Sequence, residues 1–285
     1  MALVVIVGPT ASGKTSASLD IAEEMGAFIV SADSRSIYKE MNIGTAKPSL
    51  EERRGIPHWG FDLVSPGDRF SVAGFKAGAE SIIKPRQEKG EHSVMVGGTG
   101  LYIDSVVLDY TFPKDRGLFS PYEVEQMNKV ELLKYYKKYN IDLPKDYQNL
   151  RRLQSGLLRD FSQSKRRSEP IENTIVVGIS TDRDILKDRI RGRINEMFSL
   201  GVVEETIYVM NKYSIDDAKL PGNVYPIIAR YIKNELNLEE AKQQIYTADW
   251  RLAKRQHTWF NRSKFIKWLP ASEVTGFVRG EIKDL

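Results

Sequence analysis

The sequence predicts an α/β fold in which helices cover both faces of a mostly parallel sheet. Short apolar, β-branched runs alternate along the chain with longer stretches of helical periodicity. This alternation is typical of buried parallel strands connected by helices. A segment in the middle of the chain has helical periodicity but no such apolar run. We therefore expect a sheet-forming core that carries a small all-helical insertion.

The composition limits the kind of protein. The chain has 285 residues, 41% of them hydrophobic and 28% charged, which is ordinary for a soluble globular protein. It contains no cysteine, which excludes disulfides, zinc–cysteine sites and thiol nucleophiles. No apolar stretch approaches the roughly 20 residues that span a bilayer, and the N-terminal run is typical of a buried strand rather than a signal peptide. We expect a cytoplasmic protein that acts as a monomer without a membrane partner.

The expected strands, in chain order, are residues 3–7, 27–31, 93–96, 174–179 and 265–268. Helices are expected near residues 14–25, 71–89, 183–199, 203–212, 226–235 and 239–260. Ligands of open parallel sheets bind at the carboxyl ends of the strands. Three loops therefore become candidates for a functional site, namely the loop after the first strand, residues 32–35 and residues 97–100.

The first of these loops has the complete phosphate-binding pattern, Gly-Pro-Thr-Ala-Ser-Gly-Lys-Thr at residues 8–15. Gly8 and Gly13 allow the backbone to wrap tightly, so that its N–H groups and the positive end of the following helix converge on phosphate oxygens. Lys14 adds a cation, and the Thr15 hydroxyl can ligate Mg²⁺. The sequence thus predicts a core like that of the P-loop NTPases, which binds a di- or triphosphate such as ATP. A glycine turn that ends in Lys-Thr by chance is the alternative.

The predicted insertion comprises residues 114–168, which leaves residues 1–113 and 169–285 as the core. Helical periodicity covers residues 124–139 and 147–161, with a proline-containing break between them and no evident strand. The insertion has a basic cluster, which consists of Arg151, Arg152, Arg159, Lys165, Arg166 and Arg167. A second basic segment, residues 250–267, interleaves its cations with aromatic side chains. Such clusters suit nucleic-acid backbones and unstacked bases, although each is equally consistent with a solvated helix face. The net charge of +4 is too small to decide between them.

The stretch after the second strand has the most specific pattern. Residues 31–48 read Ser-Ala-Asp-Ser-Arg-Ser-Ile-Tyr-Lys-Glu-Met-Asn-Ile-Gly-Thr-Ala-Lys-Pro and resemble the signature of the tRNA dimethylallyltransferases, also called tRNA isopentenyltransferases. Further segments are similar to motifs of the same family in the same order: residues 8–15, Ile-Pro-His at 56–58, Phe-Ser-Val-Ala-x-Phe at 70–75, Val-Gly-Gly-Thr-Gly-Leu-Tyr at 96–102, Arg-Ile-x-x-Met-x-x-x-Gly at 193–201 and Leu-Ala-Lys-Arg-Gln-x-Thr-Trp at 252–259. The resemblance covers most of the chain. It implies transfer of a dimethylallyl group from dimethylallyl diphosphate to N6 of the adenosine 3′ to a tRNA anticodon, with release of pyrophosphate.

The resemblance also implies roles for individual residues. The phosphate loop would hold the diphosphate through Gly8, Thr10, Ala11, Ser12, Gly13, Lys14 and Thr15, with Mg²⁺ as the cofactor. Asp33 would accept the proton of the adenine amine, a poor nucleophile whose lone pair is delocalised into the ring. A loop carboxylate that caps a helix or bonds Ser34 is the alternative for Asp33. Thr99 would form a hydrogen bond to pyrophosphate or to the amine. The alternative is that it only stabilises the Gly-Gly-Thr-Gly turn.

Two segments map onto the tRNA-contacting segments of the family. The residues concerned are Ser34, Arg35 and Ser36 in the core, and Gln148, Asn149 and Arg152 in the insertion. The target base would have to leave the anticodon stack to reach a diphosphate inside the core, which implies base flipping. The insertion would then clamp the anticodon arm and recognise its shape and splayed bases.

The chain departs from the family pattern at three places. The family has Thr-Arg-Gln where this chain has Asp249, Trp250 and Arg251, so the family arginine that reaches the pyrophosphate aligns with Trp250. Arg251 lies one position further, about 100° around a helix, and is the candidate replacement at the diphosphate. A Gly-Tyr-Arg turn of the family is Val-Tyr-Pro at residues 224–226, and the first arginine of the second tRNA segment is Asn149.

Other function classes explain parts of the sequence. A small-molecule or nucleotide kinase that uses ATP accounts for residues 8–15 equally well, but it does not account for the surroundings of Asp33 or for the basic insertion. A nucleotide-dependent RNA-binding switch without catalysis would use the basic segments and tolerate Trp250. An enzyme that prenylates free adenine nucleotides would have no need of a tRNA-clamping insertion.

Overall fold

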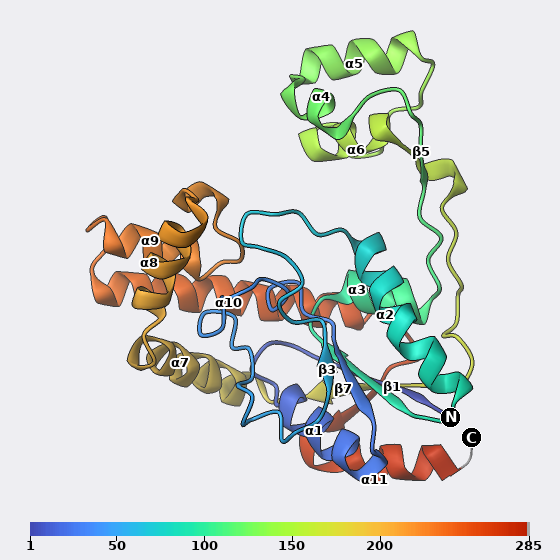
Figure 1. The fold of residues 1–285 in the computed structure, drawn as a ribbon, viewed down its shortest axis with the longest axis vertical. Helices are drawn as coiled ribbons and strands as arrows, with labels where there is room; N and C mark the ends of the chain where they lie inside the picture. Colours follow the sequence, from blue (N-terminus) through green and yellow to red (C-terminus); the bar gives the residue numbers. More distant parts are fainter. Residues whose placement is uncertain (284–285) are drawn as a thin grey trace. The chain divides into compact units, whose positions relative to one another are not determined.

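The computed structural model describes residues 1–283. The chain divides into two compact units, one formed by residues 1–107 and 169–285 and the other by residues 108–168. The second unit therefore begins at Leu108 rather than at residue 114. Each unit has its own buried apolar core, and Figure 1 shows the elements of both.

The first unit is built on a six-stranded sheet whose strands lie in the order β3-β2-β4-β1-β7-β8. The strands are β1 Leu3–Val7, β2 Phe28–Ser31, β3 His58–Trp59, β4 Ser93–Gly97, β7 Thr174–Ser180 and β8 Lys267–Pro270. All neighbouring pairs are parallel, and Leu3 is in register with Ser93 on one side and with Thr174 on the other. Every residue of β1 is buried, as its continuous apolar run predicts. The expected parallel α/β sheet is confirmed.

Helices cover both faces of this sheet, also as expected. On one face, α1 (Lys14–Met25) and α11 (Ala271–Lys283) pack against alternate strand residues such as Val4 and Ile6. On the other face lie α2 (Val72–Glu88) and α3 (Gly100–Val107) (Figure 1). There Phe75 stacks on Tyr102 with ring centroids 4.2 Å apart.

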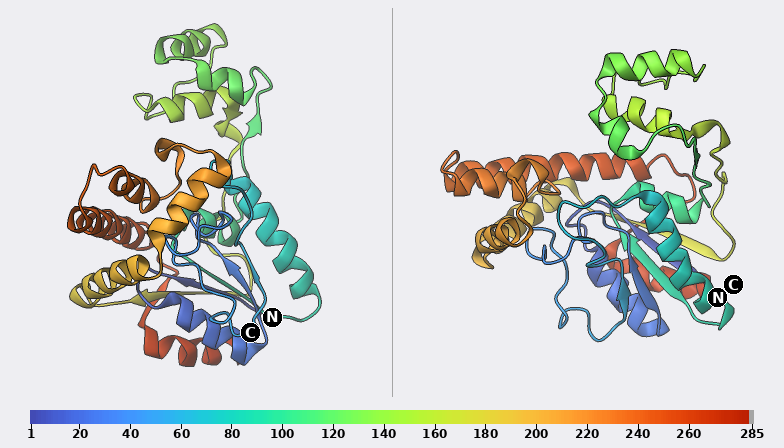
Figure 2. Two further views of the ribbon diagram at one scale, coloured as in Figure 1. Left: turned by 60° about the vertical axis from the view of Figure 1, so that its left-hand side comes forward. Right: turned by 45° about the horizontal axis from the view of Figure 1, so that its top comes forward.

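Four further helices of the first unit gather beside the sheet (Figure 2). They are α7 Arg183–Ser199, α8 Val202–Tyr213, α9 Tyr225–Ile232 and α10 Leu238–Phe260, with the short 3₁₀ turn η2 Asp217–Lys219. Their apolar faces form a second buried cluster, which also takes in Met41 from the loop after β2. This cluster brings α7 and α10 next to the loops at the carboxyl ends of the strands.

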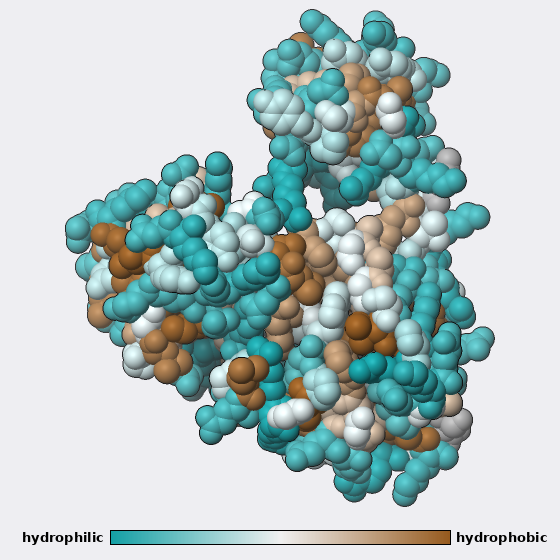
Figure 3. Space-filling model, viewed as in Figure 1, coloured by the Kyte–Doolittle hydropathy of each residue, from teal (hydrophilic) through white to brown (hydrophobic). Residues whose placement is uncertain are grey.

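The second unit is a small helical bundle with a core of Val124, Leu132, Tyr136, Leu153 and Leu157. Its helices are α4 Pro121–Gln126, α5 Lys129–Lys138 and α6 Leu150–Leu158, followed by the 3₁₀ turn η1 Phe161–Gln163. The predicted helix over residues 124–139 is in fact two helices, because capping boxes begin one at Ser120 and the next at Asn128. Most of the visible surface of this unit is hydrophilic (Figure 3).

The prediction of an all-helical insertion is wrong in one respect. Two short strands, β5 Lys114–Asp115 and β6 Arg159–Asp160, pair antiparallel where the chain enters and leaves the bundle. A further bridge joins Thr111 to Lys165. Two neighbouring extended segments satisfy their backbone N–H and C=O groups by pairing with each other. Strands of two residues are too short to produce an alternating pattern in the sequence.

Candidate active site

The phosphate loop between β1 and α1 has the backbone that its glycines predict. Gly8 has a φ of 151° and Gly13 a φ of 95°, conformations that side-chain-bearing residues rarely adopt. A Cβ on Gly8 would lie 3.1 Å from the Ser12 Oγ and 3.3 Å from the Ile179 carbonyl oxygen. No side chain caps α1 at Gly13, so the first N–H groups of this helix face outward as donors for a ligand.

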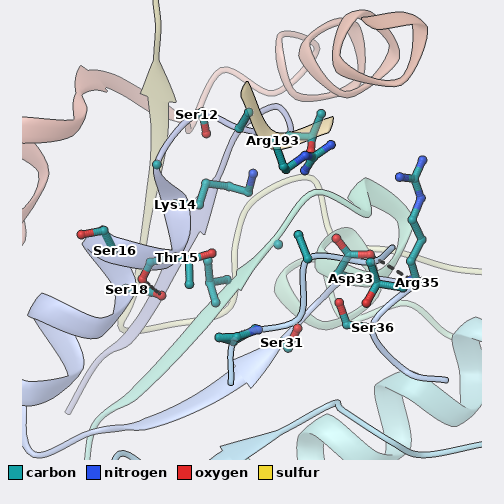
Figure 4. Close-up of a pocket in the computed structure, with 18 of the residues that line it drawn as sticks. Ser12, Lys14, Thr15, Ser16, Ser18, Ser31, Asp33, Arg35, Ser36 and Arg193 are labelled. Carbon is teal, nitrogen blue, oxygen red and sulfur yellow. Dashed lines mark hydrogen bonds between the residues drawn. The ribbon is translucent and has the colours of Figure 1, made fainter. Parts of the chain in front are cut away.

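A cavity of about 650 Å³ opens at this loop, at the carboxyl ends of β1, β2 and β4. Its wall contains the following residues that the sequence predicted: Thr10, Ala11, Ser12, Gly13, Lys14, Thr15, Asp33, Arg35 and Ser36. The loops after β1 and β2 therefore meet at one site beside the end of β4, as expected for a parallel sheet. Figure 4 shows Lys14, Asp33, Arg35 and Arg193 around the same space.

Lys14 supplies a cation at the base of the cavity. Its Nζ donates to the Pro9 carbonyl oxygen at 2.5 Å. Burial lowers the pKa of Lys14 to about 8, the charge of Asp33 acts in the opposite direction, and the neighbouring Arg193 lowers it further. The site thus concentrates positive charge that a bound anion would stabilise.

Asp33 lies in the wall of the same cavity. Its Oδ1 accepts a hydrogen bond from the Arg35 backbone N–H at 2.9 Å, drawn as a dashed line in Figure 4. This is the local turn contact that the sequence left as the alternative role. It uses one carboxylate oxygen, and the residue still faces the cavity. The structure is therefore consistent with both roles, and catalysis by Asp33 stays a prediction.

Thr99 lies outside the cavity wall and fastens the Asp33 loop. Its Oγ1 accepts from the Ser34 backbone N–H at 2.9 Å and donates to the Ser34 Oγ at 3.1 Å. Its own N–H donates to the Ala32 carbonyl oxygen at 3.1 Å. The Thr99 hydroxyl is thus engaged by Ser34, which favours the turn interpretation over a catalytic role.

The glycines beside Thr99 are required by close packing. A Cβ on Gly97 would lie 2.2 Å from the Ala32 carbonyl oxygen, one on Gly98 2.1 Å from the Gln256 Nε2, and one on Gly100 2.2 Å from the Trp259 Cδ1. All three distances are far below a normal contact. The Gly-Gly-Thr-Gly motif therefore allows β4, the Asp33 loop and α10 to approach one another.

Two cavity residues that we did not predict come from distant helices. Arg193 of α7 donates from NH1 to the Thr10 Oγ1 at 2.6 Å. Gln256 of α10 accepts from the Thr10 N–H at 2.8 Å and donates to the Gly98 carbonyl oxygen at 3.1 Å, so it joins the phosphate loop to the turn after β4. Arg193 lies in the motif at residues 193–201 and Gln256 in the motif at residues 252–259. These motifs are the sequence feature that could have identified both residues.

Two polar groups at this wall suit an anionic ligand. Among residues 1–283, the Ser12 Oγ and the Arg193 Nε are buried side-chain atoms without a hydrogen-bond partner. Buried polar groups are normally paired. Both are donors and both belong to residues of the cavity wall, so an oxygen-rich anion fits there.

The prediction for Arg251 does not agree with the structure. Leu252 and Gln256 of α10 line the cavity, whereas Arg251 is exposed on another side of the helix. It borders a separate hollow that is formed by Arg251, Lys254, Arg255, Thr258, Trp259 and Arg262. The step of about 100° from one residue to the next turns Arg251 away. Two arginines of α7 reach the phosphate loop instead: Arg193 contacts Thr10, and Arg189 donates from NH1 to the Ser12 carbonyl oxygen at 3.3 Å.

The predicted RNA-contacting residues of the second unit have local roles. Asn149 caps α6 by accepting from the Arg151 N–H at 3.0 Å. Gln148 accepts from the Lys129 Nζ at 2.5 Å. Arg152 is exposed, and neither it nor Arg159 forms an ion pair within the described part of the chain. Arg152 and Arg159 therefore remain available to an anionic partner.

Among residues 1–283, no three or more His, Asp or Glu side chains are grouped so that they could hold a metal ion. In the same residues, no helix is both long and apolar enough to cross a membrane.

The chain is similar to known family models and to known proteins. The chain matches the family model described as IPP transferase over residues 36–263 and the one described as isopentenyl transferase over residues 1–58. It is 35% identical over 304 residues to the tRNA dimethylallyltransferase of Bacillus mycoides strain KBAB4, which spans 99% of this chain and 95% of that protein. It is 37% identical over 285 residues to the tRNA dimethylallyltransferase of Thermoanaerobacter sp. strain X514, with 93% and 90% coverage.

Solved structures show the same likeness. The full-length tRNA isopentenylpyrophosphate transferase of Bacillus halodurans superposes with a TM-score of 0.73 at 29% identity, over 99% of this chain and 97% of that one. A eukaryotic dimethylallyltransferase acting on tRNA has a TM-score of 0.76 at 22% identity, over 95% and 74%, and supports the fold alone.

Proposed function

The chain belongs to the IPP transferase family of tRNA dimethylallyltransferases, and from this premise we propose that it transfers a dimethylallyl group from dimethylallyl diphosphate to tRNA. The acceptor is N6 of the adenosine 3′ to the anticodon. The named relatives favour this function over the ATP-dependent kinase. Because tRNA is the substrate, we place the reaction in the cytoplasm. We also propose that the protein acts as a monomer.

The observation that carries the proposal is the polarity of the cavity. Lys14 and Arg193 adjoin the phosphate loop, and Asp33 lies in the wall of the same space. Cations that are already in place stabilise the negative charge that grows on a leaving diphosphate. A carboxylate in the same space can accept a proton from an incoming amine.

The proposed transfer forms one bond, breaks one bond and moves one proton. The N6 nitrogen forms a bond to the allylic carbon while the carbon–oxygen bond to the diphosphate breaks. The electron pair of that bond leaves with pyrophosphate, which Lys14, Arg193 and the backbone N–H groups of the loop stabilise. Asp33 accepts the proton that N6 loses.

A Mg²⁺ ion is compatible with this cavity. Magnesium in nucleotide and diphosphate sites keeps several waters and is held partly by the phosphates, so it needs few protein ligands. The Thr15 hydroxyl lies in the cavity wall and would supply one. The ion would add positive charge beside the diphosphate.

The partner RNA must present an unpaired base. An adenine inside an anticodon stack cannot reach a cavity lined by β-strand ends, so the base has to flip out. Exposed cations offer contacts for the RNA backbone in each unit. They are Arg152 and Arg159 in the second unit, and in the first unit Arg251, Lys254 and Arg255 on α10 with Arg262 just after its end. We assign the second unit to the anticodon arm.

A labelling experiment tests the proposed function. The protein is incubated with dimethylallyl diphosphate labelled in the prenyl group, or with ATP labelled at the γ-phosphate, each with and without tRNA. We expect prenyl label in tRNA only, and a single labelled nucleoside on digestion. Label transferred from ATP to a small molecule would support the kinase, and no transfer from either would support a binding protein.

Charge reversal in the second unit tests its assignment to tRNA. We expect Arg152→Glu with Arg159→Glu to weaken tRNA binding and to reduce the slope of log Kd against log salt concentration by about one unit for each lost phosphate contact. Transfer at saturating tRNA should persist. Binding titrations over a salt series measure the effect.

A control variant has the same net charge as the double arginine variant. Lys84→Glu with Lys89→Glu changes the charge by the same amount at exposed positions at the end of α2. If this control flattens the salt dependence as much as the arginine variant does, the effect is one of overall charge and the assignment of the second unit is wrong.

A further inference from the structure

Asp249 of α10 is a fully buried carboxylate directly behind the cavity. Its side chain has 0% exposure. Its Oδ2 accepts from the Arg193 NH2, its Oδ1 lies 3.5 Å from the Arg35 NH1, and the same Oδ1 accepts from the Asn223 Nδ2 at 2.7 Å. One carboxylate therefore holds two guanidinium groups that come from different elements.

Both of these arginines line the cavity, whereas Asp249 does not. Arg193 reaches the Thr10 Oγ1 through NH1 while its NH2 is held by Asp249. The two contacts fix both terminal nitrogens of a planar group, so its orientation at the phosphate loop is determined. Arg35 meets the other carboxylate oxygen from the loop that also carries Asp33.

The charges explain why this carboxylate is needed. Four cationic side chains line one cavity, namely Lys14, Arg35, Arg189 and Arg193. The proximity of Arg193 already lowers the pKa of Lys14. Without a buried counter-charge the guanidinium groups would repel each other and turn toward Asp33, a carboxylate of the same cavity. Asp249 attracts them from behind, which leaves the Asp33 carboxylate unpaired with either.

The neighbouring residue strengthens this argument. Trp250 stands where the family pattern has an arginine, and it packs beneath the Arg183 and Lys187 cations at 5.4 and 5.8 Å from its ring centre. It supplies no charge to the cavity. Because this arginine is missing, the orientation of Arg193 matters more in this chain than in the family pattern. At position 249 the chain has an aspartate where the family pattern has a threonine.

We infer that Asp249 is a positioning residue for the diphosphate site, acting through Arg193. The inference deepens the proposed function and rests on it for the identity of the substrate. It predicts that removal of the Asp249 charge weakens diphosphate binding only while Arg193 is present. A purely structural role predicts lower thermal stability with an unchanged Kd for the folded fraction.

Calorimetric titration with inorganic pyrophosphate and Mg²⁺ tests the inference without relying on prenyl transfer. Four proteins form a cycle: wild type, Asp249→Asn, Arg193→Ala and the double variant. We expect Asp249→Asn to raise the Kd about 10- to 100-fold, the range typical for losing a residue that orients a binding side chain. In the Arg193→Ala background the same change should alter the Kd less than about threefold, because coupled residues are not additive.

Asp104→Asn is the matched control. Asp104 is also buried, accepts from the Trp259 Nε1 at 2.9 Å and is no part of the cavity wall. We expect it to lower the melting temperature without changing the Kd. Asp249→Thr, which introduces the family residue, serves as a second variant if Asp249→Asn does not fold, with the same expected rise in Kd.

Three results would overturn the inference. The first is an unchanged Kd for pyrophosphate in the folded Asp249 variants. The second is a double variant whose rise in Kd equals the product of the two single rises, and the third is an equal rise in Kd in Asp104→Asn. Failure of the proposed function looks different, because wild type would then bind pyrophosphate but transfer no prenyl group.

Discussion

Asp33→Asn is expected to leave both substrates bound while slowing prenyl transfer by roughly 10²–10⁴-fold, the usual range for loss of a general base. Asparagine keeps the size of the side chain and an Oδ1, so it can still accept the hydrogen bond from the Arg35 N–H that holds the turn. It cannot accept the proton of N6. Single-turnover transfer at saturating substrates measures the chemical step, and thermal melts of the same samples report stability.

Asp182→Asn is the control for the turn. Asp182 also accepts a hydrogen bond from the backbone N–H two residues on, at 2.8 Å to Asp184, but it caps α7 and is no part of the cavity wall. A capping role for Asp33 would cost about 1 kcal/mol of stability with a near-normal rate per folded molecule. An Asp33→Asn protein that melts early yet transfers at the wild-type rate would refute catalysis by Asp33. The proton acceptor would then have to be sought among the other carboxylates of the cavity wall, such as Glu196.

The parts of the site that the sequence predicted are local in the chain. The phosphate loop, its glycines and Lys14 follow from one contiguous motif between a strand and a helix, and each of these elements forms where expected. The loop with Asp33 follows β2 directly. The meeting of these two loops can be predicted from one rule, because the carboxyl ends of parallel strands lie at one edge of a sheet.

The parts that were missed depend on tertiary packing. Arg193 and Gln256 reach Thr10 from helices that lie far away in sequence, at positions set by the packing of α7 and α10. A sequence shows the period of a helix, but it does not show which residue of that helix faces a loop 246 residues earlier in the chain. For this reason Arg251 was expected at the phosphate loop, although Leu252 and Gln256 face it.

Two helices also escaped prediction for physical reasons. Nearly all residues of α3 are buried, so it has no polar face and produces no helical period. In α11, Gly276 and Gly280 lower the helix propensity, and the packing of Val274 and Val278 on the sheet overrides it.

Lys14→Ala is the second substitution with a large expected effect. It removes a cation at the base of the cavity, where backbone donors and Arg193 remain. We expect weaker binding of dimethylallyl diphosphate and slower transfer, with a loss on the order of 2–4 kcal/mol in transition-state stabilisation, comparable with removal of one preorganised electrostatic donor. The affinity for tRNA should change little. Activity equal to that of wild type would contradict the assignment of the phosphate loop to the diphosphate.

The pKa of Lys14 adds a test that does not depend on loss of function. In the free protein burial lowers this pKa to about 8, so the ammonium is largely protonated below that pH and loses its charge above it. Since kcat/KM reports ionisations of the free enzyme, kcat/KM for dimethylallyl diphosphate should be level below about pH 8 and fall at higher pH. Lys14→Arg keeps a cation that does not deprotonate in this range, so its profile should lack the fall, whatever its absolute rate. A wild-type profile that stays flat to pH 10, or an arginine variant with the same inflection, would show that the charge of Lys14 does not bind the diphosphate.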